Sequence, residues 1–577
     1  MWWLPIVAQV AAAVPPDSAR ILRAARSAQA DFEQYRIANL LRSRGGSRGS
    51  RCDEVVGRFC FWHDEDDGWA PSPDPPAIQA ARRRFLDVLD SLAALHPADP
   101  WIAGQRVRYL VESEANGEAL DAARACRASG WWCAALVGYA RHAGGDYAGA
   151  DSAFAAALAA MPEKQRCSWT DLSPVLDDLR SRYRKLSCAE REALERRIWW
   201  LADPLYLVPG NERRTEHFSR RLVNALQDHA RSAYGMRWGT DLEELLIRYG
   251  WPVGWERAEE TSAQPSGPSI ISHHPPATWQ FLPPARFVEA PPTMGAADWN
   301  LSPERPVTSY APPYAKVFHA LPHQLAVFRR GDSIVVVASY DVRATRHEHG
   351  ATGRIIDERR EGRKVSEVQA ALVLTHDERA APLVVRGTGS GPEGVMTAIA
   401  RAAPALLSIE TLDTADSVHA ARARYWLPVP PPTKDVTLSE PLLLSRAPDD
   451  SLRPSLADVL PLARPTSRVR RGERVWMFWE TYGLEGVTGP VRITLSIAHV
   501  GRSWVRQAAE WAGLVGRDPR YVSLSWEEWP PQGTSVYSRA FAMSMPEASP
   551  GNYTLELTVT SPGGPTVRTQ RDIIVER

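Results

Sequence analysis

The sequence predicts a multidomain α+β chain in which an N-terminal α-helical solenoid is followed by two antiparallel β-sandwich domains. The first 205 or so residues are rich in Ala and Arg, and their apolar residues recur at the three- and four-residue intervals of helices. A proline-rich stretch follows, and from His323 onward short apolar runs alternate as strands do. At 577 residues the chain is long enough for about three to four domains.

We place the domain boundaries where the composition changes. The predicted parts are a signal peptide (1–16), a disulfide-linked helical domain (17–205), a central segment (206–258), a Pro-rich linker (259–322), a first β-sandwich (323–430) and a second β-sandwich (431–577).

The first residues are apolar and are followed by small residues, as in a secretory signal peptide, although no positive charge precedes them. This run is shorter than the roughly 20 apolar residues that span a bilayer, and no other segment is apolar enough to span one. We therefore expect an exported protein without an integral membrane segment.

The six cysteines support the same location. They form three close pairs, which is typical of disulfides in an oxidising compartment. The spacing does not fix the connectivity, but pairing between nearest neighbours is the simplest arrangement. We expect a secreted or periplasmic protein with an association with the cell envelope. The residues are Cys52, Cys60, Cys126, Cys133, Cys167 and Cys188.

Helices are expected throughout the N-terminal part. Their ranges are 17–41, 77–96, 101–114, 118–129, 131–143, 147–161, 172–186 and 189–200. Gly138, Tyr147, Phe154 and Pro162 stand where the tetratricopeptide repeat (TPR) has such residues, and Gly104 precedes Gly138 by the repeat's 34-residue period. This resemblance implies a TPR-like solenoid that binds a protein partner. That these helices only pack against the rest of the chain remains an open alternative.

The central segment contains apolar residues at helical spacing over 213–234, and Gly235 is placed to end that helix. The run 242–249 suits a helix or a strand equally well. Trp238-Gly-Thr-Asp241 and Ile247-Arg-Tyr-Gly-Trp-Pro252 resemble the signature of the GWxTD domain family, and 211–218 resembles its helical lead-in. Arg237 stands where the family has its first glycine. The resemblance implies flanking β-domains and an exported setting, but no established activity.

Several polar and aromatic residues of this segment form a candidate site at the junction of the helical and β parts. They either converge in a polar cleft or fix the junction structurally, with Thr240 or Asp241 capping a helix and arginines pairing with carboxylates. The candidates are Arg213, Glu216, His217, Trp238, Thr240, Asp241, Arg248 and Tyr249.

The two C-terminal domains have short strands at the spacing of immunoglobulin-like sandwiches. Among the chain's 22 tryptophans, a group in the second domain suits either a packed core or an exposed platform for sugars. These are Trp476, Trp479, Trp504, Trp511, Trp526 and Trp529.

Other function classes have weaker support. The net charge is zero, which argues against nucleic-acid binding. The sequence contains no GxxxxGK[ST] loop, HExxH motif or paired CxxC, so we predict no catalytic residues, metal or cofactor. We therefore expect an exported, non-catalytic scaffold that binds a protein partner. A hydrolase-type enzyme with its site at the junction, or a carbohydrate-binding β-domain, is the alternative.

Overall fold

A computed structural model gives the fold. It describes residues 16–43, 52–62, 72–258, 270–274, 279–301, 307–344, 347–348, 355–356, 367–389, 391–415, 418–428, 435–449, 453–499, 522–544 and 550–576. Most of the predicted signal peptide, together with Trp504 and Trp511, lies outside these ranges.

The chain is divided into two compact units, and both contain β-structure. The first unit comprises Met1–Pro204, Val208–Glu289 and Ser302–Pro312, and the second comprises Leu205–Leu207, Ala290–Leu301 and Pro313–Arg577. The chain is thus a mixed α+β, multidomain protein, as predicted.

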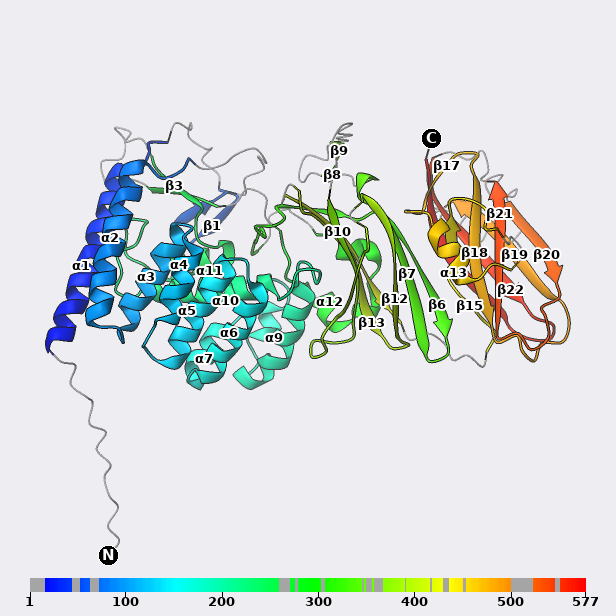
Figure 1. The fold of residues 1–577 in the computed structure, drawn as a ribbon, viewed down its shortest axis with the longest axis horizontal. Helices are drawn as coiled ribbons and strands as arrows, with labels where there is room; N and C mark the ends of the chain where they lie inside the picture. Colours follow the sequence, from blue (N-terminus) through cyan, green and yellow to red (C-terminus); the bar gives the residue numbers. More distant parts are fainter. Residues whose placement is uncertain are drawn as a thin grey trace, which may run out of the picture. The chain divides into compact units, whose positions relative to one another are not determined.

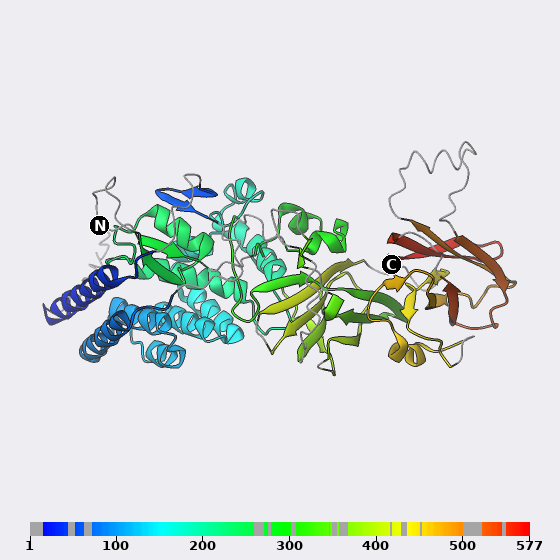
Figure 2. The same cartoon turned by 90° about the horizontal axis from the view of Figure 1, so that it is seen from above.

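The first unit is mainly helical (Figure 1). Its helices are α1 (Pro16–Asn39), α2 (Pro76–Leu95), α3 (Pro100–Glu112), α4 (Asn116–Arg124), α5 (Gly130–Ala143), α6 (Tyr147–Ala160), α7 (Glu163–Thr170), α8 (Arg180–Tyr183), α9 (Cys188–Ala202), α10 (Glu212–Leu226), α11 (Thr240–Tyr249) and α12 (Ala285–Glu289). Its strands are β1 (Glu54–Val56), β2 (Phe59–Phe61), β3 (Gly254–Arg257) and β4 (Ile270–His273). In both views the blue β1–β2 hairpin lies near the later, green part of this unit (Figures 1 and 2).

Two helical expectations need correction. The helix expected over 172–186 is reduced to the four-residue α8, because Pro174 has no N–H and the Asp171 side chain holds the backbone N–H of Ser173 in a turn. The central helix ends at Leu226 rather than Tyr234. The Leu226 carbonyl accepts a 2.6 Å hydrogen bond from the Gln105 amide, and His229 then takes a positive φ of 57°. The run 242–249 is helical, and it ends at Gly250 with a φ of 84°.

Nearest-neighbour pairing of the cysteines is confirmed. Disulfides join Cys52 to Cys60, Cys126 to Cys133, and Cys167 to Cys188. The first closes the β1–β2 hairpin, the second links α4 to α5, and the third links α7 to α9. None of the helices in the described ranges combines the length and apolar character that a bilayer crossing requires.

The second unit contains two β-domains. Its strands are β5 (Val317–Ala320), β6 (His323–Arg330), β7 (Ser333–Asp341), β8 (His347–Glu348), β9 (Ile355–Ile356), β10 (Val368–Thr375), β11 (Leu383–Arg386), β12 (Glu393–Arg401), β13 (Ala405–Asp413), β14 (His419–Leu427), β15 (Thr437–Leu438), β16 (Leu442–Leu444), β17 (Arg468–Arg470), β18 (Arg474–Tyr482), β19 (Val491–His499), β20 (Val522–Glu528), β21 (Val536–Ser544), β22 (Gly551–Thr560) and β23 (Thr566–Glu576). The short helix α13 (Leu456–Val459) precedes β17.

Each β-domain buries side chains from two sheets in one core. In the first domain, sheet β11-β10-β13-β14-β5 shares a core with sheet β12-β7-β6. In the second, strands β15, β18, β16 and β21 share a core with sheet β17-β23-β22-β19-β20. The pairing is antiparallel except for β14 with β5 and β17 with β23, which are parallel. A further apolar cluster, including Phe328 and Phe478, joins the two domains.

Candidate functional site

Helix α10 of the central segment is part of the core of the helical unit. Its apolar residues Phe218, Leu222 and Leu226 share one buried cluster with residues of α3, α5 and α6. A Cβ built on Gly104 of α3 would lie 2.3 Å from a methyl carbon of Leu226. Any larger residue at position 104 would force the Leu226 side chain to move. The central segment is therefore an integral layer of the helical unit.

The charged face of α10 is neutralised by an ion pair. The Glu216 carboxylate lies 2.5 Å from Nε of Arg220 and 2.9 Å from Nε2 of His142. Burial opposes ionisation of Glu216, but Arg220 and His142 outweigh it and hold the pKa of this carboxyl well below its usual range. Glu216 is therefore an ionised, partly buried counter-ion at neutral pH.

Arg220 also binds the end of α11. It donates hydrogen bonds to the carbonyls of Ile247 (3.1 Å), Arg248 (2.8 Å) and Ser309 (2.8 Å). A Cβ on Gly250 would lie 3.1 Å from a guanidinium nitrogen of Arg220. Gly250 can adopt its positive φ at little cost, and its lack of a side chain leaves room for the Arg220 guanidinium.

Arg213 reaches the same backbone from the start of α10. It donates to the Thr308 hydroxyl (3.0 Å), and Thr308 donates to the Arg248 carbonyl (2.7 Å). The Arg213 guanidinium also lies 5.9 Å from the ring centre of Trp199 and 5.8 Å from that of Tyr310. Burial, followed by the nearby Arg220, lowers the pKa of Arg213 to about 9. Aromatic faces therefore contribute to holding this cation.

The β1–β2 hairpin pairs with both charged motif residues of α11. Asp241 accepts hydrogen bonds from Nε and Nη2 of Arg58, and Arg248 lies 2.5 Å from the carboxylate of Glu54. Tyr249 donates to Glu54 and accepts a 2.8 Å hydrogen bond from Arg248. The hydrogen bonds from Arg58 lower the pKa of Asp241 to about 2. The disulfide-closed hairpin thus provides the counter-charges of the motif.

The remaining candidates have separate structural contacts. His217 is fully buried, and its Nε2 lies 3.3 Å from the Trp169 carbonyl. Burial lowers the pKa of His217 well below 6.5, and Arg221 adds to this effect, so the ring is neutral. Trp238 donates to the side chain of Asn224 (2.9 Å). Neither Thr240 nor Asp241 is the N-cap of α11. That residue is Gly239, with no side-chain cap.

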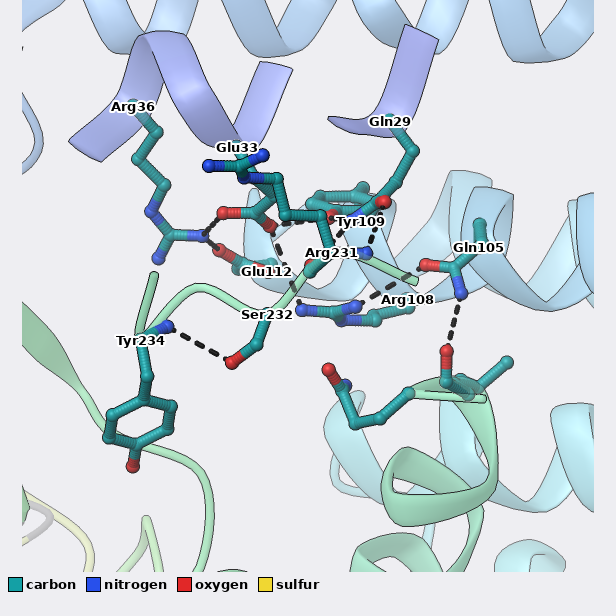
Figure 3. Close-up of polar contacts among 12 residues, drawn as sticks. Gln29, Glu33, Arg36, Gln105, Arg108, Tyr109, Glu112, Arg231, Ser232 and Tyr234 are labelled. Carbon is teal, nitrogen blue, oxygen red and sulfur yellow. Dashed lines mark hydrogen bonds and ion pairs between the residues drawn. The ribbon is translucent and has the colours of Figure 1, made fainter. Parts of the chain in front are cut away.

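A second polar cluster, which the sequence analysis did not identify, lies where α1 meets α3 (Figure 3). Arg36 lies 2.6 Å from Glu112 and 3.6 Å from Glu33, and Tyr109 donates a 2.5 Å hydrogen bond to Glu33. Burial raises the pKa of Glu33. Burial also opposes ionisation of Glu112, but Arg36 outweighs it, with help from Arg82 and Arg108, and lowers the pKa of Glu112. We call Glu33, Arg36, Arg108, Tyr109 and Glu112 the α1–α3 cluster.

Tryptophans of the central segment cover the α1–α3 cluster. The Arg108 guanidinium lies 4.8 Å from the ring centre of Trp251, and that of Arg36 lies 5.2 Å from Trp255. Trp251 stacks in turn on Trp238, with ring centres 6.3 Å apart. Trp251 and Trp255 therefore cover these buried arginines through cation–π contacts.

These contacts favour a structural role for the polar residues. Several of these charged side chains are almost completely buried, so a substrate could not reach them. They are Arg213, His217, Glu33, Arg36 and Arg108. No three His, Cys, Asp or Glu side chains gather as metal ligands within the described ranges. A helical-wheel reading of Gln29, Glu33 and Arg36, which share the buried face of α1 with Phe32, could have found the cluster from the sequence.

Comparison with known proteins gives no family. No family model and no curated protein matches the chain. Among solved structures, Spo0M, a sporulation control protein from Bacillus subtilis, is similar to 25% of this chain at 12% identity and a TM-score of 0.15. Red sea bream transglutaminase is similar to 44% of it at 10% identity and a TM-score of 0.13. The chain spans 50% and 31% of those two chains. Likenesses this weak carry no argument about fold or function.

Proposed function

We propose that the protein is an exported, non-catalytic scaffold of the GWxTD type that binds a protein partner through its TPR-like helices. The observation that carries this proposal is that the charged residues of the motif and its lead-in helix form ion pairs within the protein. Asp241 and Arg248 of α11 pair with Arg58 and Glu54 of the β1–β2 hairpin. Arg220 of α10, which is paired with Glu216, donates to the backbone carbonyls of Ile247 and Arg248 at the end of α11. Charged groups that are paired in this way stabilise the helical unit and do not act on a substrate.

The exported location rests on the three disulfides. Such bonds persist in secreted and periplasmic proteins and are rare in reducing compartments. Both β-domains have the two-sheet organisation that immunoglobulin-like modules use as spacers or docking units. The hydrolase alternative is less well supported, because His217 is buried against Trp169 and Asp241 is occupied by Arg58.

The partner is expected on the face of α6 that α10 leaves free. Tyr147, Phe154 and Ala157 of α6 are buried, whereas Ser152, Ala155, Ala156, Ala159 and Ala160 are exposed. Alanines lose no side-chain entropy on binding, so this face suits the close approach of another helix.

Affinity capture of the full-length chain from an envelope fraction tests the proposal. Ala156→Arg should remove a specific, stoichiometric partner by placing a long charged side chain on the α6 face. Ala94→Arg, at an exposed position of α2, is the matched control and should retain it. Failure to recover any specific partner, or equal recovery with both variants, would contradict the proposal.

A further inference from the structure

Strand β12 forms one margin of the three-stranded sheet β12-β7-β6, and among the described strands it pairs only with β7. It is nine residues long and contains no Pro or Lys, two residues that commonly protect a sheet edge from further pairing. An edge strand presents a row of N–H and C=O groups that its own sheet does not use. An edge of this length can therefore accept another strand.

The backbone hydrogen bonds show which residues of β12 face the free edge. The Val342 N–H donates a 2.9 Å hydrogen bond to the Pro392 carbonyl, and the Ala402 N–H donates one of 2.9 Å to the Asp332 carbonyl. Both bonds follow the β12–β7 register, so the even-numbered residues of β12 bond with β7. The odd-numbered residues direct their N–H and C=O groups toward the free edge. They are Glu393, Val395, Thr397, Ile399 and Arg401.

The same odd-numbered residues place their side chains on the outer face of the sheet. Met396 and Ala398, which alternate with them, are buried in the core of the first β-domain, whereas Val395 is 36% exposed and Ile399 is 68% exposed. On the next strand, Val335 lies opposite Ile399 and shares a buried cluster with residues of β16 and α13. Exposed apolar side chains of β12 therefore lie where the covered part of this face ends.

The opposite margin of the sheet, strand β6, is closed by side chains. The Arg329 N–H donates a 3.0 Å hydrogen bond to the Tyr482 hydroxyl, and the Leu325 carbonyl accepts a hydrogen bond from Arg571. Within the described ranges, no such bond reaches the outward N–H groups of β12. Only the β12 margin of this sheet is therefore open to a further strand.

We infer that β12 pairs with β12 of a second copy of this chain, antiparallel and centred on Thr397. Two-fold symmetry then places Glu393 opposite Arg401 of the second copy, Val395 opposite Ile399, and Thr397 opposite its counterpart. Opposite charges, apolar β-branched side chains and paired threonines are all favourable cross-strand neighbours. Because every one of these residues directs its backbone groups outward, the side-chain pairs and the backbone hydrogen bonds agree on one register.

The side chains also select a second copy and this register. A shift by two residues would retain the backbone hydrogen bonds but place Glu393 opposite Ile399. The Glu393 carboxylate already contacts Arg343 of its own copy, yet its side chain remains 50% exposed and can meet a second cation. The pairing would join the two three-stranded sheets into one continuous sheet across the two copies.

Sedimentation velocity of the full-length protein tests the inference, and the wild type should form a concentration-dependent dimer. Thr397→Pro removes the central outward N–H without removing a bond to β7, as proline in an edge strand allows. It should weaken dimerisation about tenfold or more, since both hydrogen bonds of the central pair are lost. Thr397→Val keeps the N–H and the branched side chain, and should change the dimer affinity less than about threefold.

Charge variants cover the case in which Thr397→Pro does not fold. Glu393→Arg and Arg401→Glu each place like charges opposite each other at both ends of the paired strands, so each variant alone should dimerise about tenfold more weakly. An equal mixture of the two variants should form a heterodimer with nearly the wild-type affinity, because every end pair then joins opposite charges. Native mass spectrometry separates the heterodimer from the two homodimers.

A wild type that stays monomeric would overturn the inference and leave the edge to an extended segment of another protein. Full dimerisation of folded Thr397→Pro would also overturn it. Charge variants that dimerise as the wild type does, or a mixture of them that stays monomeric, would overturn the register.

Discussion

The carboxylate of Asp241 lies against the guanidinium of Arg58, whose Nη2 donates a 2.9 Å hydrogen bond to Oδ1, although 183 residues separate them in the sequence. Gly57, at the tip of the same hairpin, has a φ of +54°, and a Cβ there would lie 2.4 Å from Cβ of Asp241. The hairpin can therefore approach α11 only because its tip has no side chain.

Gly57→Ala should lower the free energy of unfolding by about 1–3 kcal/mol, since it combines an unfavourable φ with a steric clash. Chemical denaturation of the full-length chain measures this change. Gly117→Ala is the control. Gly117 lies in α4 with open space around its Cα, so alanine there should stabilise the protein by up to about 1 kcal/mol. Equal effects of the two substitutions would argue against the hairpin contact.

Glu216→Gln should destabilise the helical unit by about 1–3 kcal/mol, because it leaves the buried Arg220 without its counter-ion. Glu192→Gln is a matched control, since Glu192 forms the same i, i+4 pair with Arg196 on the exposed side of α9. That change should cost less than about 0.5 kcal/mol. If Glu216→Gln lowers the free energy of unfolding no more than Glu192→Gln does, the Glu216–Arg220 pair contributes no more to stability than an exposed pair.

The stability of the helical unit should depend on the ionisation of Glu195. Burial raises the pKa of Glu195 to about 7, and Tyr183 donates a 2.5 Å hydrogen bond to its carboxyl. Between about pH 4.5 and 7 the folded state holds a proton that the unfolded state has lost, so stability falls as the pH rises through this window.

Glu195→Gln should remove that decline, which amounts to at most about 3 kcal/mol. Unfolding free energies measured from pH 4 to 8 give the difference between variant and wild type. The exposed Glu192→Gln variant, on the same helix, should retain the wild-type profile. A difference that does not change with pH would rule out a titrating Glu195.

The disulfides should contribute unequally to stability. Replacing Cys167 and Cys188 by serine opens a loop with a sequence separation of 21, and replacing Cys126 and Cys133 opens one of 7. Loop-closure entropy predicts losses of about 3 and about 2 kcal/mol, respectively. Denaturant titrations of the two double variants measure these losses. A larger loss for the Cys126–Cys133 pair would show that the entropy of the unfolded chain is not the main term.

Local signals in the sequence predicted local features correctly. Helical periodicity located most helices to within a few residues, and cysteine spacing suggested the right disulfide pairs. The predicted end of α10 was wrong because the side-chain amide of Gln105, 121 residues earlier in the sequence, donates a hydrogen bond to the Leu226 carbonyl. Gly235, which the sequence suggested as the end of this helix, lies beyond its actual end at Leu226. Sequence periodicity carries no information about such a distant hydrogen bond.

Only some of the candidate residues of the central segment are connected to one another in the structure. Arg213, Glu216 and the backbone of Arg248 are joined through Arg220 and Thr308. Glu54, which pairs with Arg248, and Arg58, which pairs with Asp241, lie in the β1–β2 hairpin, far from α11 in the sequence. The α1–α3 cluster was missed because its charges interrupt an apolar face, and charged residues usually face water.

The position of α10 also determines which lengths of chain can fold independently. Phe218, Leu222 and Leu226 complete the core around Phe154, so residues 17–205 alone would expose an apolar face to water. During synthesis, the early helices must wait for residues 212–226 before this layer can close. A truncation placed at the compositional boundary near residue 205 would therefore yield an aggregation-prone fragment rather than an autonomous domain.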